Sequence, residues 1–368
     1  MCKDMSAITI VMLCFSMLGA VDLIIGNKLG LGKEFERGIL LLGTMVMAMV
    51  GMIVFAPLIA HLLRPAIDWL CGILPIEPSV IPSMILANDM GGAQLAMEFA
   101  TNESVGNFNG LIVSSMVGVT ISFTLPFALG VVAKEKHNTL MLGLLCGIIT
   151  TPLGCLVSGI MCALPIKDLL ASLIPLFIFT GLLAIALFSV PNICLKVFKV
   201  FGKIIQTIIF LGLAVGIFEA LTGIDLIPYT APVQEGFDIC TNAAMVLSGA
   251  FPLVYVLSKL LDKPMKKIGG KMGINSTATV GLLSMLATSA APFGNMKDMD
   301  EKGAMLNSAF SVSAAFVFGS HLAFTMSLNA DYVVSMIVGK LVAGIASLFV
   351  AVLLYKILHK KQGLEQTA

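Results

Sequence analysis

Asp89 has the clearest capacity for chemistry in this sequence, because it is a carboxylate at the centre of an otherwise apolar segment, Ser79 to Ala100. If that segment lies in a membrane, as argued below, an ionised carboxylate there costs a few kcal/mol or more, so it is interpreted first as a functional group that needs a cation nearby. The structural alternative is that Asp89 caps the helix that follows, since aspartate is a good N-cap and a helix N-terminus favours negative charge. The two roles are compatible, and the position of Asp89 in an apolar segment favours a functional role over capping alone.

Further residues that could bind a small polar solute lie beside Asp89 and in a second broken segment, 274–303. Asn88 precedes Asp89, and Gly91 and Gly92 follow it, where glycine lets the chain turn and lets a ligand approach the backbone. Close helix packing through small residues explains either glycine alone equally well. The second segment is interrupted between residues 288 and 295, and its candidates for lining a solute pathway are Thr288, Ser289 and Asn295.

A third group of candidates, Ser311, Ser313, Ser320 and His321, lies in the apolar segment 304–328. His321 is the only histidine within a predicted span, so its ring should face protein or a water-filled cavity. Lone buried histidines often have a structural role, but His321 aligns with Thr120 in the internal repeat described below, which favours a position on the pathway. A proton-relay role is a weaker alternative. Most of the small polar residues are expected to hydrogen-bond between helices.

Motifs for catalysis, cofactor binding and energy coupling are absent from the sequence. It contains no GxxxxGKS/T, HExxH or GxSxG pattern and no metal-spaced ligands, so we expect no catalytic residue, no cofactor and no bound metal. The eight cysteines fall mostly in apolar runs without a CxxC pair, which indicates buried thiols rather than disulfides or a metal site. A net charge of +1 without a long charged tract gives no sign of nucleic-acid binding.

The elements that must position these residues are membrane-spanning helices. The 368-residue chain is 58% hydrophobic and 12% charged, with a mean hydropathy of +1.01, whereas soluble domains carry about 25% charged residues. About 20 apolar residues cross a bilayer as a helix, which satisfies its own backbone in lipid. The first run lacks a small-residue cleavage site, so it is interpreted as a span rather than a signal peptide. Nine spans are predicted, at 5–26, 38–63, 110–132, 139–164, 168–190, 197–220, 239–261, 304–328 and 332–357.

The placement of lysine and arginine decides whether the two broken segments cross the membrane, because these residues concentrate in cytoplasmic loops. If both segments turn back, all 22 Lys and Arg residues except Lys3, Arg64, Lys167 and Lys340 fall on one side, and Lys340 lies within the last span. If both segments cross, this bias nearly vanishes. We therefore expect an all-α integral membrane protein with nine spans and two re-entrant hairpins, one entering from each face. Its N-terminus is expected outside and its C-terminus in the cytoplasm.

The two halves of the chain also contain similar short motifs in the same order. Ala56-Pro57 corresponds to Phe251-Pro252, and Pro65 to Pro264, at offsets of about 195 to 201 residues. An odd number of predicted crossings separates the units, so the second would be inverted relative to the first, and inverted repeats with broken helices are typical of transporters. We expect a single polytopic membrane domain, 1–368, with a first repeat at about 38–132 and a second at about 239–328.

Three stretches carry a resemblance to a known family: Asp89-Met90-Gly91-Gly92, Gly249-Ala250-Phe251-Pro252, and the run from Pro292 to Phe324, with 293–300 and 307–316 as its most specific parts. In these stretches the chain resembles the EutH family of ethanolamine-utilisation membrane proteins, over nearly its whole length. The resemblance implies a permease or facilitator for ethanolamine in the bacterial cytoplasmic (inner) membrane. It also implies that the imported ethanolamine feeds an ammonia lyase inside a microcompartment.

The implied substrate suits the candidate residues. Ethanolamine is a primary amine, protonated at pH 7 as a lysine ammonium is, and Asp89 offers that ammonium a partner, while its hydroxyl would pair with Asn88, a serine or a backbone group. The sequence departs from the family at Ser320, because an aspartate commonly precedes the histidine in other members. A second membrane carboxylate is therefore absent, so either that aspartate is not needed for substrate binding or this protein differs from the family in pH dependence, coupling or substrate.

The sequence leaves several alternatives open. A transporter of another small amine or polar metabolite is the nearest one, and an enzyme acting on lipid head groups is less favoured because no nucleophile or metal constellation is found. Ion coupling and facilitated diffusion are both compatible with the sequence. Membrane lipids are expected partners, and a homodimer is expected by analogy with other transporters built from inverted repeats.

Overall fold

The computed structural model describes residues 7–365, and within them it is all-helical, without a strand. The first half contains α1 (Ala7–Ile24), α2 (Leu31–Met45), η1 (Val46–Val50), α3 (Gly51–Ile73), α4 (Val80–Ile85), η2 (Asn88–Met90), α5 (Gly92–Phe99), α6 (Glu103–Asn107), η3 (Phe108–Gly118), η4 (Thr120–Thr124), α7 (Leu125–Val131), η5 (Lys134–Lys136), α8 (His137–Ile148) and α9 (Thr151–Met161). The second half contains α10 (Ile166–Ser189), α11 (Pro191–Thr222), α12 (Val233–Met272), α13 (Ser276–Met285), α14 (Ala290–Gly294), η6 (Met296–Asp298), α15 (Glu301–Ala314), α16 (Ser320–Leu328), η7 (Ala330–Tyr332) and α17 (Val333–Glu365).

Eight helical stretches of the described residues are long and apolar enough to cross a membrane, so the protein is a multi-pass membrane protein. They correspond to eight of the nine predicted spans and lie at Ala7–Ile24, Leu31–Ile73, Glu103–Val131, Lys134–Met161, Ile166–Ser189, Lys196–Thr222, Val233–Leu261 and Ala330–Leu358.

The prediction of 304–328 as one continuous span is wrong, because the helix is broken between α15 and α16. Phe316 adopts a left-handed conformation, with φ of 62°. The N–H groups of Phe316 and Phe318 bond to the carbonyls of Met285 and Leu286, at 3.1 and 2.9 Å, instead of to their own helix. Irregular backbone survives at this depth because another segment of the protein supplies its hydrogen-bond partners.

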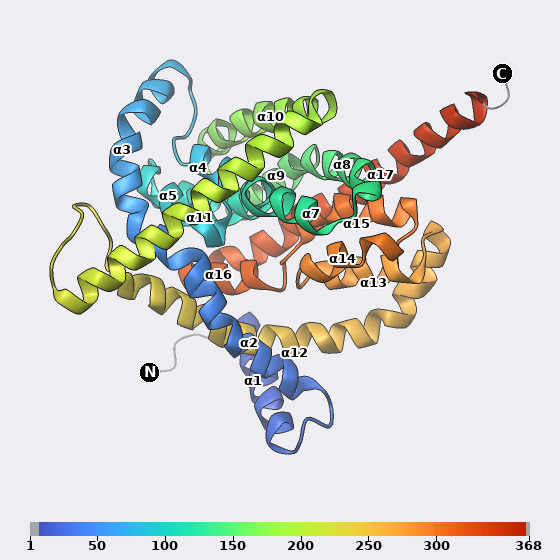
Figure 1. The fold of residues 1–368 in the computed structure, drawn as a ribbon, viewed down its shortest axis with the longest axis horizontal. Helices are drawn as coiled ribbons and strands as arrows, with labels where there is room; N and C mark the ends of the chain where they lie inside the picture. Colours follow the sequence, from blue (N-terminus) through green and yellow to red (C-terminus); the bar gives the residue numbers. More distant parts are fainter. Residues whose placement is uncertain (1–6, 366–368) are drawn as a thin grey trace.

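The spans divide into peripheral and central helices, arranged around the middle of the molecule (Figure 1). In Figure 1, α1, α2 and α12 lie together in the lower part, α10 lies at the top, and α11 runs diagonally from the upper right to the lower left. Of the apolar window in α1, 17% is buried, compared with 83% in the span that contains η3. The outer helices expose large side chains such as Phe177, Leu182 and Phe188, which is the surface that a helix in contact with lipid presents. The polar residues therefore gather on the inner helices.

The two broken segments flank these inner helices, and their interruptions agree with the sequence prediction. In the first, α4 and α5 contact one another and η3, and the chain between them passes through η2 and a left-handed Gly91 with φ of 91°. In the second, α13 contacts α14 and α15, and the helix is interrupted at 286–289 and again around Asn295.

The helix that crosses between these segments is π-helical over η3 and η4, and every residue of η3 is buried. π-helical turns are rare and are frequent at functional sites. The unusual winding places polar groups in the middle of the protein: the Asn109 amide donates to the hydroxyls of Ser79 and Ser172, at 2.8 and 3.0 Å. The first broken segment and α10 are thus both fastened to this central helix by buried hydrogen bonds.

Glycines let several of these helices approach closely. Gly212 of α11 packs on the backbone of Gly51 in α3, and Gly216 packs against Val54 and Val233. This GxxxG pair therefore serves contacts within the chain.

The cysteines follow the sequence prediction only in part. All seven within the described residues are free; four are buried, Cys71 and Cys162 are half-buried, and Cys14 is exposed on the outer helix α1, while Cys2 lies outside the described residues.

Candidate functional site

Asp89 lines a cavity of about 310 Å³ that also brings together Thr288, Ser320 and His321. These residues come from three separate parts of the chain: the tip of the first broken segment, the interruption of the second, and the start of α16. The rest of the wall is mainly apolar and aromatic, with Met45, Met49, Phe123, Phe251 and Phe316 among its residues. The structure thus groups four of the predicted site residues around one space.

Asp89 reaches this cavity because of the turn at η2. The N–H groups of Met90 and Gly92 both bond to the Ala87 carbonyl, at 3.0 and 2.9 Å, so the chain reverses tightly here. Gly91 is the N-cap of α5, and no side chain caps that helix. The capping alternative for Asp89 is therefore wrong in this structure. Its carboxylate interacts instead with the side chain of Ser320.

Ser320 and His321 form the first turn of α16, and η2 contacts that helix. The positive end of the α16 dipole lies beside the Asp89 carboxylate, which favours a negative charge there. The His321 side chain is 1% exposed, and its ring lies 5.1 Å from that of Phe316. The break before α16 is what places this helix terminus in the middle of the protein.

Lys340 of α17 also belongs to this site, through its contact with His321 and its charge beside Asp89. It is fully buried, and its Nζ lies 2.5 Å from the Ser115 carbonyl of η3 and 3.1 Å from Nδ1 of His321. Its charge also acts on Asp89, although within the described residues the two make no direct salt bridge. Lys340 is the cation that a carboxylate at this depth requires, and its signal in the sequence was a single charge in an apolar span.

The remaining predicted residues lie apart from this cavity in different ways. Asn88, Ser289 and Ser313 are fully buried, and their side-chain polar atoms have no hydrogen-bond partner among the described residues. Ser311 donates to the Ser308 carbonyl of its own helix, at 2.7 Å. Buried polar groups without partners are costly, so the first three mark places that water or a solute would satisfy.

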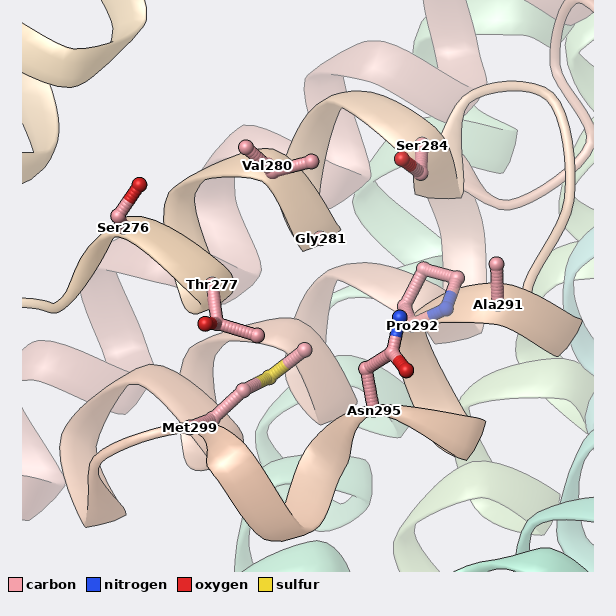
Figure 2. A pocket seen from close by; sticks show the side chains of 9 residues that line it. All are labelled: Ser276, Thr277, Val280, Gly281, Ser284, Ala291, Pro292, Asn295 and Met299. Carbon is pink, nitrogen blue, oxygen red and sulfur yellow. The ribbon is translucent and has the colours of Figure 1, made fainter.

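Asn295 lies in a different cavity, of about 260 Å³, between α13 and the stretch that contains α14 and η6 (Figure 2). Figure 2 shows Asn295 and Met299 on one side of it and Ser276, Thr277 and Val280 of α13 on the other. The prediction grouped Asn295 with the other pathway residues, but the structure separates it from Asp89.

The two glycines after Asp89 have the geometric role that the sequence suggested. A Cβ on Gly91 would overlap the Met52 side chain, and one on Gly92 would lie 2.7 Å from the Ala87 carbonyl oxygen. Both positions therefore require glycine for close packing, and Gly91 also requires it for its positive φ.

Comparison with known proteins places the chain in a family. Residues 5–354 match the model of the family described as "Ethanolamine utilisation protein, EutH". The chain is 42% identical over 358 residues to the "Probable ethanolamine permease EutH" of Listeria monocytogenes, an alignment that covers 97% of this chain and 96% of the relative. It is 35% identical over 382 residues to the Escherichia coli protein of the same name, with 94% of each covered. It is 34% identical over 341 residues to the uncharacterized protein YxeR of Bacillus subtilis, with 93% and 92% covered.

No solved structure matches the chain. The family match nevertheless covers nearly the whole sequence, including all the residues that line the Asp89 cavity. The chain therefore belongs to the EutH family.

Proposed function

We propose that this protein carries ethanolamine across the bacterial cytoplasmic membrane into the cell. The observation that carries the proposal is the Asp89 carboxylate, held in a cavity between the broken segments in the middle of a multi-pass membrane protein. The names of the Listeria and Escherichia relatives, probable ethanolamine permeases, support the choice of substrate. The cavity offers groups suited to both ends of that molecule.

The ammonium of ethanolamine would pair with Asp89, and its hydroxyl would pair with Ser320 or Thr288. The aromatic rings of Phe123, Phe251 and Phe316 line the same cavity, and an ammonium is attracted to the face of such rings. Arg37 also lines the cavity, where its guanidinium lies 4.9 Å from the centre of the Phe251 ring.

Transport would use two inverted repeats whose broken segments enter the membrane from opposite faces as re-entrant hairpins. Matching contacts about 200 residues apart support this part of the proposal. Asn109 donates to the hydroxyl of Ser79 at the start of the first broken segment, at 2.8 Å. Asn307 donates to the carbonyl of Ala278 at the start of the second, at 2.9 Å.

A second pair of contacts has the same spacing. Gly51 of α3 packs against the backbone of Ile209 in α11, and Gly249 of α12 packs against the backbone of Met12 in α1. The pair α3–α11 thus corresponds to the pair α12–α1. Two related units that rock against each other around a central site give the alternating access that a carrier needs.

Uptake of labelled ethanolamine into proteoliposomes tests the proposal, with wild type compared with Asp89→Asn. The variant should take up at least tenfold less substrate, because it removes the partner of the ammonium and leaves Lys340 without its carboxylate. Glu98→Gln is the matched control, since Glu98 is an exposed acid on α5, and it should transport at the wild-type rate. Equal uptake by wild type and Asp89→Asn would overturn the role of Asp89.

The same vesicles distinguish the substrate class and the coupling. Ethylamine lacks the hydroxyl and ethylene glycol lacks the amine, so ethanolamine should compete better than either. Stronger competition by another small amine would favour the alternative that the carrier serves that amine. Accumulation above equilibrium only with an imposed proton or sodium gradient would indicate a coupled transporter, and equilibration without one would indicate a facilitator.

A further inference from the structure

Lys340 is the buried charge that ethanolamine binding by itself does not explain. It lies within the last span, is 0% exposed, and has two hydrogen-bonding neighbours, the Ser115 carbonyl and Nδ1 of His321. Removing an ammonium from water costs several kcal/mol even after relaxation, so a lysine at this depth needs a function. A carrier for a cation would bind that cation more tightly without a second cation beside the site.

The titratable groups that face Lys340 come from three elements: Asp89 from η2, Cys155 from α9 and His321 from α16. η3 contributes only a backbone carbonyl, that of Ser115.

Other charged residues near α17 lie at its ends. Glu301 and Lys302, from the start of α15, lie beside Tyr355, and Asp331 lies beside Tyr332. The Asp89 carboxylate is therefore matched by the Lys340 ammonium, while Arg37, which also lines the cavity, is ion-paired with Glu34 at 3.3 Å.

His321 connects the two charges. A lysine ammonium is a donor only, so Nδ1 of His321 must accept from Lys340, and a neutral ring then carries its own proton on Nε2. The His321 ring lines the cavity that contains Asp89, and its neighbour Ser320 interacts with the Asp89 carboxylate. A proton on Lys340 thus has a hydrogen-bonded route, through the histidine, to the space where the substrate binds.

We propose that Lys340 is a tethered counter-cation of Asp89 that releases one proton when a substrate ammonium enters the cavity, so that cation binding leaves the net charge of the site unchanged. The inference rests on the proposed function. The N–H bond of the Lys340 ammonium breaks and its electron pair stays on Nζ. The proton passes to Nδ1 of His321, and the proton on Nε2 of the ring leaves to water in the cavity. Two ammonium groups beside one buried carboxylate repel each other strongly in a low dielectric, and this drives the release.

Calorimetric titration of the purified full-length protein with ethanolamine tests the inference, in two buffers of different ionisation enthalpy. The difference between the heats gives the number of protons released on binding, and wild type should release about one. Lys356→Met removes an exposed lysine from the same helix and should release about one proton, as wild type does.

Lys340→Arg keeps a cation at this position, so Asp89 stays ionised. Arginine does not give up its proton in proteins, so this variant should bind ethanolamine at least tenfold more weakly than wild type and release no proton. Binding to wild type without proton release would overturn the inference and leave the proposed function intact. Proton release by Lys340→Arg would also overturn it, because arginine cannot supply the proton. No binding to wild type would overturn the proposed function, and the inference with it.

Discussion

Single residues carry the chemistry of this protein, and their depth in the fold decides what they can do. Asp89 and Lys340 are each a lone charge in an apolar stretch, and the structure brings them to the same site through Ser320 and His321. Position 320, whose side chain interacts with the Asp89 carboxylate, is a serine and adds no second carboxylate to the site. Asp89 is therefore the carboxylate of this cavity that the buried Lys340 ammonium balances.

Labelling of introduced cysteines tests which residues share a cavity with the substrate. In a variant whose eight native cysteines are replaced by serine, Thr288→Cys should react with a small aqueous maleimide, and ethanolamine should slow the reaction severalfold because Thr288 lines the Asp89 cavity. Asn295→Cys should react without protection, since Asn295 lines the separate cavity of Figure 2. Equal protection of both positions would contradict the separation of the two cavities.

Among the elements, the interrupted helices are the ones that build the site. The tip at η2, the interruption at 286–289 and the break before α16 each contribute one or two of the four predicted residues around the Asp89 cavity. A regular helix would place these side chains on a continuous surface and would use their backbone groups internally. The breaks free the chain to turn a helix terminus and a carboxylate toward the same space.

Gly91→Ala tests the turn that presents Asp89. The substitution places a Cβ at a φ of 91°, in the left-handed region, which costs roughly 1–2 kcal/mol for a non-glycine residue, and the new Cβ would also overlap Met52. We expect a lower thermal unfolding temperature and reduced ethanolamine uptake. Gly130→Ala is the control, because a Cβ there meets no atom within 4 Å. A wild-type unfolding temperature for Gly91→Ala would contradict this account of the turn.

At the scale of the whole molecule, the number of crossings fixes the sides on which the two ends lie. Eight continuous helices and the broken pair α15–α16 make nine crossings if the pair spans the membrane. An odd number would place the termini on opposite sides, and from the lysine and arginine distribution we expect the C-terminus in the cytoplasm. A homodimer is a prediction at this scale as well, and its test is the mass of the purified protein in detergent.

Epitope tags at the two ends test the topology in intact and permeabilised spheroplasts. The N-terminal tag should bind antibody in intact cells, and the C-terminal tag only after permeabilisation. Accessibility of both tags in intact cells, or of neither, would mean an even number of crossings and would remove the α15–α16 pair or another segment from the count.

The sequence by itself determined the membrane class, most of the span positions, the break at residues 88–92 and the family, because each of these depends on local composition or on contiguous motifs. A run of about 20 apolar residues favours a membrane span in any fold, and a Gly-Gly pair likewise favours a turn. The sequence also identified Asp89, because a charge in an apolar run is exceptional in any fold.

Only the tertiary structure decided which of the candidates lie together. It joined Asp89, Thr288, Ser320 and His321, separated Asn295, and brought in Lys340 from a helix that begins more than 240 residues after Asp89. It also broke 304–328, because the carbonyls of Met285 and Leu286 capture two backbone N–H groups of that segment. Contacts of this kind join residues distant in the chain, and the packing of helices against one another creates them, so no local pattern in the sequence records them.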